Sequence, residues 1–185
     1  MIIERLKKLN PYLLLFLTGV TFWFSMMYYT FSIVGTAAAM TGSGYVTMLV
    51  TVSLMSVLFS ALIANLLVRV TFRIVGGLFS RFSGLLYPFP IRFGEFSRTL
   101  LSFSFLCFFV CGLVSLPVLF LPTLSLVLGA VRTLTTWIFL FLGARYFVKT
   151  YSHDYDRKAL VTALSVIPLV LVGLSLILAI VEVAL

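Results

Sequence analysis

One uncharged stretch decides the fold: residues 9–68 run LNPYLLLFLTGVTFWFSMMYYTFSIVGTAAAMTGSGYVTMLVTVSLMSVLFSALIANLLV, without Lys, Arg, Asp or Glu. About 20 apolar helical residues cross the hydrocarbon core of a bilayer, so this stretch is too long for one transmembrane helix and suits two. Its smallest and most glycine-rich part, Gly35–Gly44, predicts a turn. We therefore expect transmembrane spans at about 12–34 and 45–68.

Two further uncharged runs follow, over residues 99–131 and 159–181. Pro117 and Pro122 divide the first of them, because proline is poorly placed inside a continuous helix. We expect spans at about 100–119, 123–144 and 160–181. The sequence thus predicts an all-α polytopic membrane protein that forms a single domain, residues 1–185, with five transmembrane helices.

The composition of the 185 residues supports a bilayer as the solvent. Hydrophobic residues make up 62% of the chain and charged residues 10%, and the mean hydropathy is +1.22. Charged residues are nearer a quarter of a soluble domain, so that class is excluded. Two cysteines are too few for a secreted disulfide scaffold, and 19 phenylalanines are too many for a disordered chain. The first apolar run is longer than a signal peptide needs, so we expect it to be retained.

Basic residues predict the orientation, because lysine and arginine gather in cytoplasmic connections. Twelve of the thirteen fall in the N-terminus, the 2–3 connection and the 4–5 connection, which share one side in a five-span topology. The N-terminus is then cytoplasmic and the C-terminus lies on the opposite side. The membrane is the cytoplasmic one in a prokaryote and an endomembrane in a eukaryote. Since these charges orient helices, we expect no nucleic acid partner.

The 2–3 connection, residues 69–99, alternates arginines with aromatic residues and predicts an interfacial segment. Gly76-Gly77 is expected to end the helical extension of span 2, and Pro88 and Pro90 exclude a long helix after it. Two interpretations stay open: ordinary interfacial anchors, or a docking surface for anionic lipid headgroups or a membrane-protein partner. The candidate surface residues are Arg69, Arg73, Arg81, Arg92 and Arg98.

Arg132 is the one basic residue inside a predicted span, near the middle of the hydrocarbon. Such a charge costs at least about 2.5 kcal/mol unless it is paired or reaches the interface. In the five-span topology it faces outward toward Glu182 or the carboxylate of Leu185, which predicts an intramembrane charge pair between spans 4 and 5. A lipid phosphate, water or a transported anion are the alternatives for its partner.

Few residues offer chemistry. No acid lies near mid-membrane, and no Gly-x-Ser-x-Gly or Ser-x-x-Lys signature is present. Residues 153–156 (His-Asp-Tyr-Asp) are interpreted as a hydrated turn rather than a metal site. Cys107 and Cys111, one helical turn apart in an apolar run, are interpreted as small core residues. We therefore predict no catalytic, cofactor-binding or metal-ligating residue, and no enzyme activity.

Several short motifs follow one another along residues 61–185. A basic extension of span 2 runs into Gly76-Gly77, Arg98-Thr99-Leu100 opens span 3, and Leu116-Pro117 closes it. Lys158-Ala159-Leu160 then enters span 5, which holds Pro168. This order resembles the Yip1 family, including its small prokaryotic members. The resemblance implies five spans, a cytoplasmic N-terminus and a role in membrane organisation or trafficking. Members that act with small GTPases have long cytoplasmic N-terminal regions, whereas here about ten residues precede span 1.

Three function classes follow. The first is a non-enzymatic membrane protein that acts by packing against lipids, other membrane proteins or further copies of itself. The second is a small transporter or channel component, which needs oligomerisation because five apolar helices enclose no obvious path. The third is an accessory subunit of a larger membrane complex.

Overall fold

The structure is a computed structural model that describes residues 2–42, 44–84, 87–119, 125–152 and 156–184. Side chains are described for all of these except residues 33, 40, 41, 118, 119, 125, 126 and 174–184. This part of the chain is helical and contains no strand, as the sequence predicts. Its elements are α1 (Ile2–Leu6), α2 (Pro11–Ser25), α3 (Met27–Thr41), α4 (Tyr45–Phe82), α5 (Phe93–Ser115), the 3₁₀ helix η1 (Leu116–Leu119), α6 (Ser125–Tyr151) and α7 (Arg157–Ala184).

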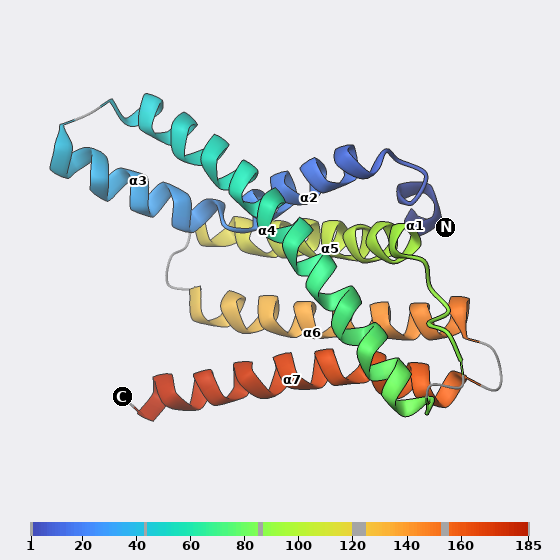
Figure 1. The fold of residues 1–185 in the computed structure, drawn as a ribbon. Coiled ribbons are helices and arrows are strands. Elements are labelled where there is room, and N and C mark those ends of the chain that lie inside the picture. Colours follow the sequence, from blue (N-terminus) through green and yellow to red (C-terminus); the bar gives the residue numbers. More distant parts are fainter. Residues whose placement is uncertain (1, 43, 85–86, 120–124, 153–155, 185) are drawn as a thin grey trace.

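The helices form an elongated bundle in which α5, α6 and α7 lie side by side and α4 crosses them at an angle (Figure 1). Helix α2 packs against α5 and α4, and α3 pairs with the first part of α4. The N-terminus and the end of α7 lie at opposite ends of the bundle (Figure 1). At the end with the N-terminus, α4 ends, α5 begins and α6 connects to α7. We call it the basic end, because the N-terminus and these two connections carry twelve of the thirteen basic residues.

Within the described residues, three helices are long and apolar enough to cross a membrane: Tyr45–Phe82, Phe93–Ser115 and Val127–Tyr151. A fourth is added if α2 and α3 count as one bent span. These helices make the chain an integral membrane protein. These helices overlap the spans expected at 45–68, 100–119 and 123–144, and the bounds and number of the spans stay a prediction.

The predicted first span is broken in the middle. Helix α2 ends at Ser25, α3 begins at Met27, and the two axes differ by 64°. The Ser25 hydroxyl donates a hydrogen bond to the carbonyl of Phe22 at 2.7 Å. Serine bonding back to its own helix bends the backbone, and sharp kinks occur where such groups enter the hydrogen-bond ladder. The span expected at about 12–34 is therefore made of two helices with a bend between them.

The turn predicted at Gly35–Gly44 is much shorter than expected. Helix α3 continues to Thr41, because alanines 37–39 are strong helix formers and outweigh the single Gly35. The helix ends at Gly42, whose φ of 65° is the left-handed conformation that glycine adopts at helix ends. Helix α4 then begins at Tyr45, where span 2 was expected to start.

Gly76-Gly77 does not end the extension of span 2. Helix α4 continues through both glycines to Phe82, and its 38 residues give it a length of about 57 Å. The flanking Val75 and Phe79 are fully buried against other helices, and this packing outweighs the weak helix propensity of glycine. The chain leaves the helix at Ser83, followed by Gly84 at φ 63°, and Pro88 and Pro90 lie outside any helix, as predicted.

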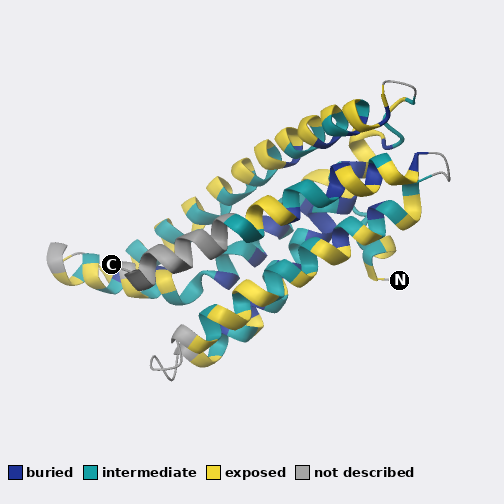
Figure 2. Cartoon of the chain, turned by 90° about the horizontal axis from the view of Figure 1, so that it is seen from below, coloured by how far each residue is buried: buried dark blue, intermediate teal, exposed yellow. Residues whose placement is uncertain are grey.

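Many of the buried residues gather toward the basic end (Figure 2). Phe79 and Phe96 pack there with Phe147 and Leu160, drawing on four different helices. We call this group the basic-end core. Its remaining buried members are Val75, Ile91, Ala163 and Leu164.

Along the middle of the bundle, α2 and α5 meet through small residues. Thr18, Ser25 and Ser102 are buried between them, and a Cβ added to Gly19 would lie 2.7 Å from the Val57 carbonyl oxygen of α4. Gly112 in turn lies directly against the Phe24 ring. Small residues let helices approach closely where lipid supplies no hydrophobic driving force. Gly19 and Gly112 thus serve close packing between helices of the same chain.

Candidate functional site

The five arginines of the predicted surface are all exposed. Arg69, Arg73 and Arg81 lie on the second half of α4, which extends beyond the uncharged residues 45–68. Arg92 immediately precedes α5, and Arg98 lies within its second turn. None of the five has a carboxylate partner among the residues that the structure describes. Their charge is therefore available to groups outside the chain.

The aromatic residues of this segment mostly face inward, which differs from the expected interfacial layer. Phe79 and Phe96 are fully buried, and Phe72 makes edge-to-face contacts with Phe89, Phe93 and Phe96 at 5.2–5.5 Å between ring centroids. Phe82 and Phe93 stay about half exposed. Aromatic residues bury large apolar areas, so this group joins the segment to the bundle instead of spreading over the headgroups.

Helices α6 and α7 provide the base on which the segment rests. The Phe96 ring stacks on Phe147 of α6 with centroids 5.0 Å apart, and Leu160 and Leu164 of α7 complete the contact. Interlocked rings in a closely packed core hold fixed positions. The arginines therefore project from a rigid support.

A polar cluster that the sequence does not reveal fastens the N-terminus to this end. The ammonium of Lys7 donates to the hydroxyls of Tyr146 and Tyr151 at 3.3 and 3.2 Å and lies 5.5 and 5.6 Å from their ring centroids. Tyr146 also donates to the Glu4 carboxylate, which lies 3.6 Å from Lys7. We call these four residues the N-terminal latch. About 140 residues separate its two halves, so no local pattern could have indicated it.

The latch shifts the ionisation of both its charged members. The hydrogen bond from Tyr146 is the main cause of the lowered pKa of Glu4, with Lys7 contributing further. Burial acts to lower the pKa of Lys7, but its bonds to Tyr151 and Tyr146 outweigh burial and raise the pKa overall. Both groups are therefore held in their charged forms at neutral pH.

Exposed cations outnumber acids around the latch. Of the acids described at this end, Glu4 is engaged by the latch, Asp156 is buried and Glu95 is exposed. Among the described residues, the solvent-facing charge of the basic end is thus strongly positive. The other exposed basic residues are Arg5, Lys8, Arg145, Lys149, Arg157 and Lys158.

Arg132 faces the break between α2 and α3. Its Nη2 donates to the Met26 sulfur at 3.4 Å, and its guanidinium carbon lies 6.0 Å from the Tyr29 ring centroid. The sequence did not predict these neighbours. The side chain of Glu182 and the residue Leu185 lie outside the described part, so the charge pair with Arg132 stays a prediction.

The other residues considered for chemistry are the two cysteines and residues 153–156. Cys107 and Cys111 are free and buried, as expected for small core residues, and the Cys111 sulfur lies 3.9 Å from the Thr136 hydroxyl. Residues 153–155 lie outside the described part. The described residues contain no group of three or more metal-ligating side chains.

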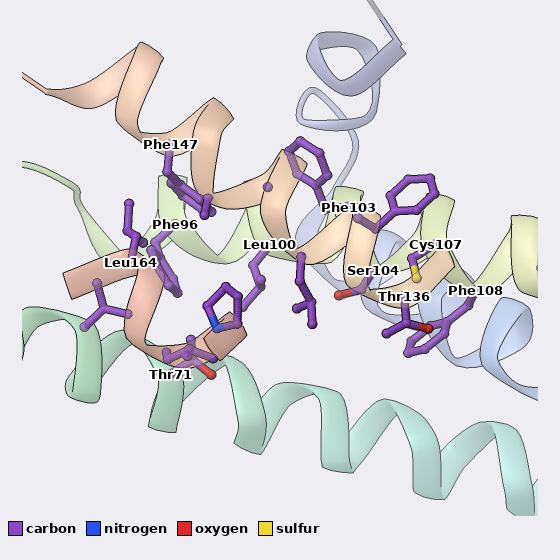
Figure 3. Close-up of a pocket in the computed structure, with 17 residues that line it drawn as sticks. Thr71, Phe96, Leu100, Phe103, Ser104, Cys107, Phe108, Thr136, Phe147 and Leu164 are labelled. Carbon is purple, nitrogen blue, oxygen red and sulfur yellow. The ribbon is translucent and has the colours of Figure 1, made fainter. Parts of the chain in front are cut away.

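Two apolar cavities open between the helices. One of about 160 Å³ lies among α4, α5, α6 and α7, with Phe96, Phe103 and Cys107 around it (Figure 3). The other, of about 370 Å³, lies among α2, α4 and α5. Leu100, Ser104 and Phe108 line both, so one face of α5 separates the two. Most of the side chains that line the two cavities are apolar.

Comparison of the chain with models of protein families, with curated proteins and with solved structures finds no match.

Proposed function

We propose that the protein is a non-enzymatic, five-span membrane protein whose basic end binds anionic lipid headgroups. The N-terminus lies in the cytoplasm and the C-terminus across the membrane. The same surface is suited to acidic membrane-protein partners or to a complex in which the chain is an accessory subunit. The Yip1 resemblance is part of this proposal, and with it a role in membrane organisation or trafficking.

One observation carries the proposal: Arg69, Arg73, Arg81, Arg92 and Arg98 are exposed, have no described carboxylate partner and project from a rigid core. Each basic residue near an anionic membrane contributes about 1 kcal/mol of attraction. The arginines stand where the uncharged part of α4 ends and α5 begins, which is the depth of the headgroups in a five-span arrangement.

The five-span topology is supported by the helix directions. The path of the chain runs away from the basic end along α2 and α3, returns along α4, and alternates through α5, α6 and α7 (Figure 1). If α2 is upright, its length of about 22 Å and the tilted α3 together rise about 32 Å, close to the hydrocarbon thickness. An impermeant reagent that labels Lys149 from outside an intact cell would contradict the orientation.

The surface is tested by replacing Arg81, Arg92 and Arg98 together with glutamine. In nanodiscs with equal phosphatidylglycerol and phosphatidylcholine, the wild type is expected to retain phosphatidylglycerol preferentially after detergent extraction. The glutamine variant should lose most of this preference, because about 3 kcal/mol of attraction is removed. Lipid mass spectrometry measures the ratio of the two lipids.

The matched control replaces the same three arginines with lysine. Lysine keeps the charge but not the planar donor geometry, so a preference based on headgroup charge should persist. Equal lipid ratios in the wild type and the glutamine variant would remove the basis of the proposal, provided that both variants melt at the wild-type temperature.

A further inference from the structure

The larger of the two cavities, which lies among α2, α4 and α5, is mostly apolar and has a volume of about 370 Å³. An apolar cavity of about 150 Å³ holds one benzene ring, so this one has space for roughly a dozen carbon atoms. Leu100, Ser104 and Phe108 of α5 form the wall that it shares with the smaller cavity (Figure 3). Its size and its walls suit a hydrocarbon chain.

Two of the hydroxyl groups on the wall are already hydrogen-bonded. Thr18 donates to the carbonyl of Leu14 at 2.8 Å, and Ser60 donates to the carbonyl of Ser56 at 2.6 Å. Hydroxyls that bond back to their own helix in this way need no polar ligand. These two positions therefore accept an apolar occupant without leaving a donor unpaired.

The cavity is open to the bilayer on one side. Phe59 and Leu67 of α4 line it and are more than half exposed, whereas Val68 and Leu101, which also line it, are buried. This part of α4 belongs to an apolar helix that is long enough to cross a membrane, so lipid surrounds its exposed side. A lipid tail can therefore enter from the side.

A neighbouring helix is too thick to fill the cavity. An α-helix is at least about 10 Å across and rises about 5.4 Å per turn, so a single turn takes up more than the 370 Å³ of the cavity. An acyl chain is only as wide as a methylene group and bends to follow the walls. Of the two occupants that a bilayer offers, the cavity thus fits the lipid tail.

An exposed strip of α4 leads from the opening toward the basic end. Ile63, Leu67, Val70 and Ile74 are all exposed and follow one another at intervals of four, three and four residues. This spacing keeps them on one side of the helix. Arg81 follows Ile74 by seven residues, which is two further turns on the same side, and it is also exposed. The strip therefore joins the cavity to a cation.

The depth of one lipid leaflet matches this path. Half of the hydrocarbon core is about 15 Å, which corresponds to about ten residues of an upright helix and more of a tilted one. Arg73 and Arg81 lie ten and eighteen residues beyond Ile63. Both are exposed, and arginine attracts the phosphate of an anionic lipid. A phosphate near these two residues places the acyl chain of the same lipid at the cavity.

We propose that this cavity binds one acyl chain of an anionic phospholipid whose headgroup lies at Arg73 and Arg81. The inference rests on the function proposed for the basic end, since it adds a site for the chain to the site for the headgroup. The chain fills space that the side chains leave empty, and the two arginines select the headgroup.

Photochemical labelling in nanodiscs tests the site. The probes are phosphatidylglycerol and phosphatidylcholine, each with a diazirine near the end of one acyl chain, and mass spectrometry locates the labelled residues. The phosphatidylglycerol probe should label Phe22 and Phe108, which line the cavity, at least about tenfold more than the phosphatidylcholine probe. Phe141, half exposed on α6, is the internal reference and should be labelled nearly equally by both.

A first variant fills the cavity and changes no charge. Ser60→Phe should reduce the labelling of Phe22 and Phe108 by phosphatidylglycerol to the level of the phosphatidylcholine probe. The matched control is Thr51→Phe, which lies on the same helix outside the cavity. The hydroxyl of Thr51 bonds to the carbonyl four residues earlier, as that of Ser60 does, so both variants lose the same kind of contact. The control should keep the wild-type labelling.

A second variant removes the headgroup contact and leaves the cavity open. With Arg73→Gln and Arg81→Gln combined, the two probes should label Phe22 and Phe108 equally. Replacement of the same two arginines with lysine should keep the preference for phosphatidylglycerol, because the charge is kept.

Two results overturn the inference while the proposed function stands. One is wild-type labelling of Phe22 and Phe108 that does not distinguish the two headgroups, and the other is labelling that survives in Ser60→Phe at the wild-type melting temperature. In both cases, the nanodisc extraction described above would still retain phosphatidylglycerol preferentially. If the wild type retains both lipids equally in that extraction, the proposed function itself fails, and the inference fails with it.

Discussion

The basic end and the middle of the bundle are held together in different ways. At the basic end, Phe79, Phe96 and Leu160 are almost completely buried in a core of large side chains. In the middle, the buried residues include Thr18, Ser25 and Ser102, and α2 approaches α4 at Gly19 and α5 at Gly112. Large apolar side chains gain free energy where burial removes them from water, whereas lipid competes for them equally well. The basic end is thus held by a core of large side chains, and the middle of the bundle by close contacts between small ones.

The largest change in the free energy of unfolding is expected when a large side chain of the basic-end core is shortened. Phe96→Ala should lower the free energy of unfolding by about 3–5 kcal/mol, because it leaves a cavity beside Phe147. Phe141→Ala, on the half-exposed face of α6, should change it by about 0.5 kcal/mol or less. Unfolding in graded denaturing detergent measures both. Equal losses for the two variants would mean that the basic end packs no more tightly than the lipid-facing surface.

A smaller effect is expected where backbones approach. Gly19→Ala places a Cβ 2.7 Å from the Val57 carbonyl oxygen, so α2 and α4 must separate, at a cost of about 1–3 kcal/mol. Gly173→Ala, with open space around it, should be neutral or slightly stabilising, since alanine favours a helix. The same unfolding experiment compares them. A neutral Gly19→Ala would show that this contact does not limit how α2 and α4 pack.

The smallest global effect is expected from the N-terminal latch. Lys7→Met should speed hydrogen exchange in residues 2–10 and change global unfolding by no more than about 1 kcal/mol, because the pairs are partly exposed. Leu13→Ala, half exposed on α2, serves as the control and should leave that exchange unchanged.

The latch also predicts a pH dependence. The pKa of Glu4 is lowered, so its contribution is complete above the ordinary value of 4.5 and is lost as the pH falls through the shifted value. The pKa of Lys7 is raised, so its contribution is complete below 10.5 and is lost as the pH rises through the shifted value. Protection of residues 2–10 should therefore be greatest between these limits. Protection that stays unchanged when the pH falls below the shifted pKa of Glu4 would contradict the role of Glu4.

Several elements could be predicted from local patterns. Uncharged runs placed α4, α5 and α6, Pro88 and Pro90 marked a non-helical connection, and the buried Cys107 and Cys111 agreed with their apolar surroundings. Local patterns did not predict where helices end or bend when contacts between distant residues determine it. Gly76-Gly77 stays helical because Val75 and Phe79 are buried beside it. The first span bends at Met26, where Arg132 contacts Met26 and the nearby Phe24 ring packs against Gly112.

By itself, the sequence determined that the chain is helical and sits in a membrane, because uncharged runs and clustered basic residues are properties of the chain alone. Only the tertiary structure decided which aromatic residues of the 69–99 segment are buried, which tyrosines hold Lys7 and what faces Arg132. Those outcomes depend on contacts between residues far apart in the chain, and no local pattern encodes which helix a side chain will meet.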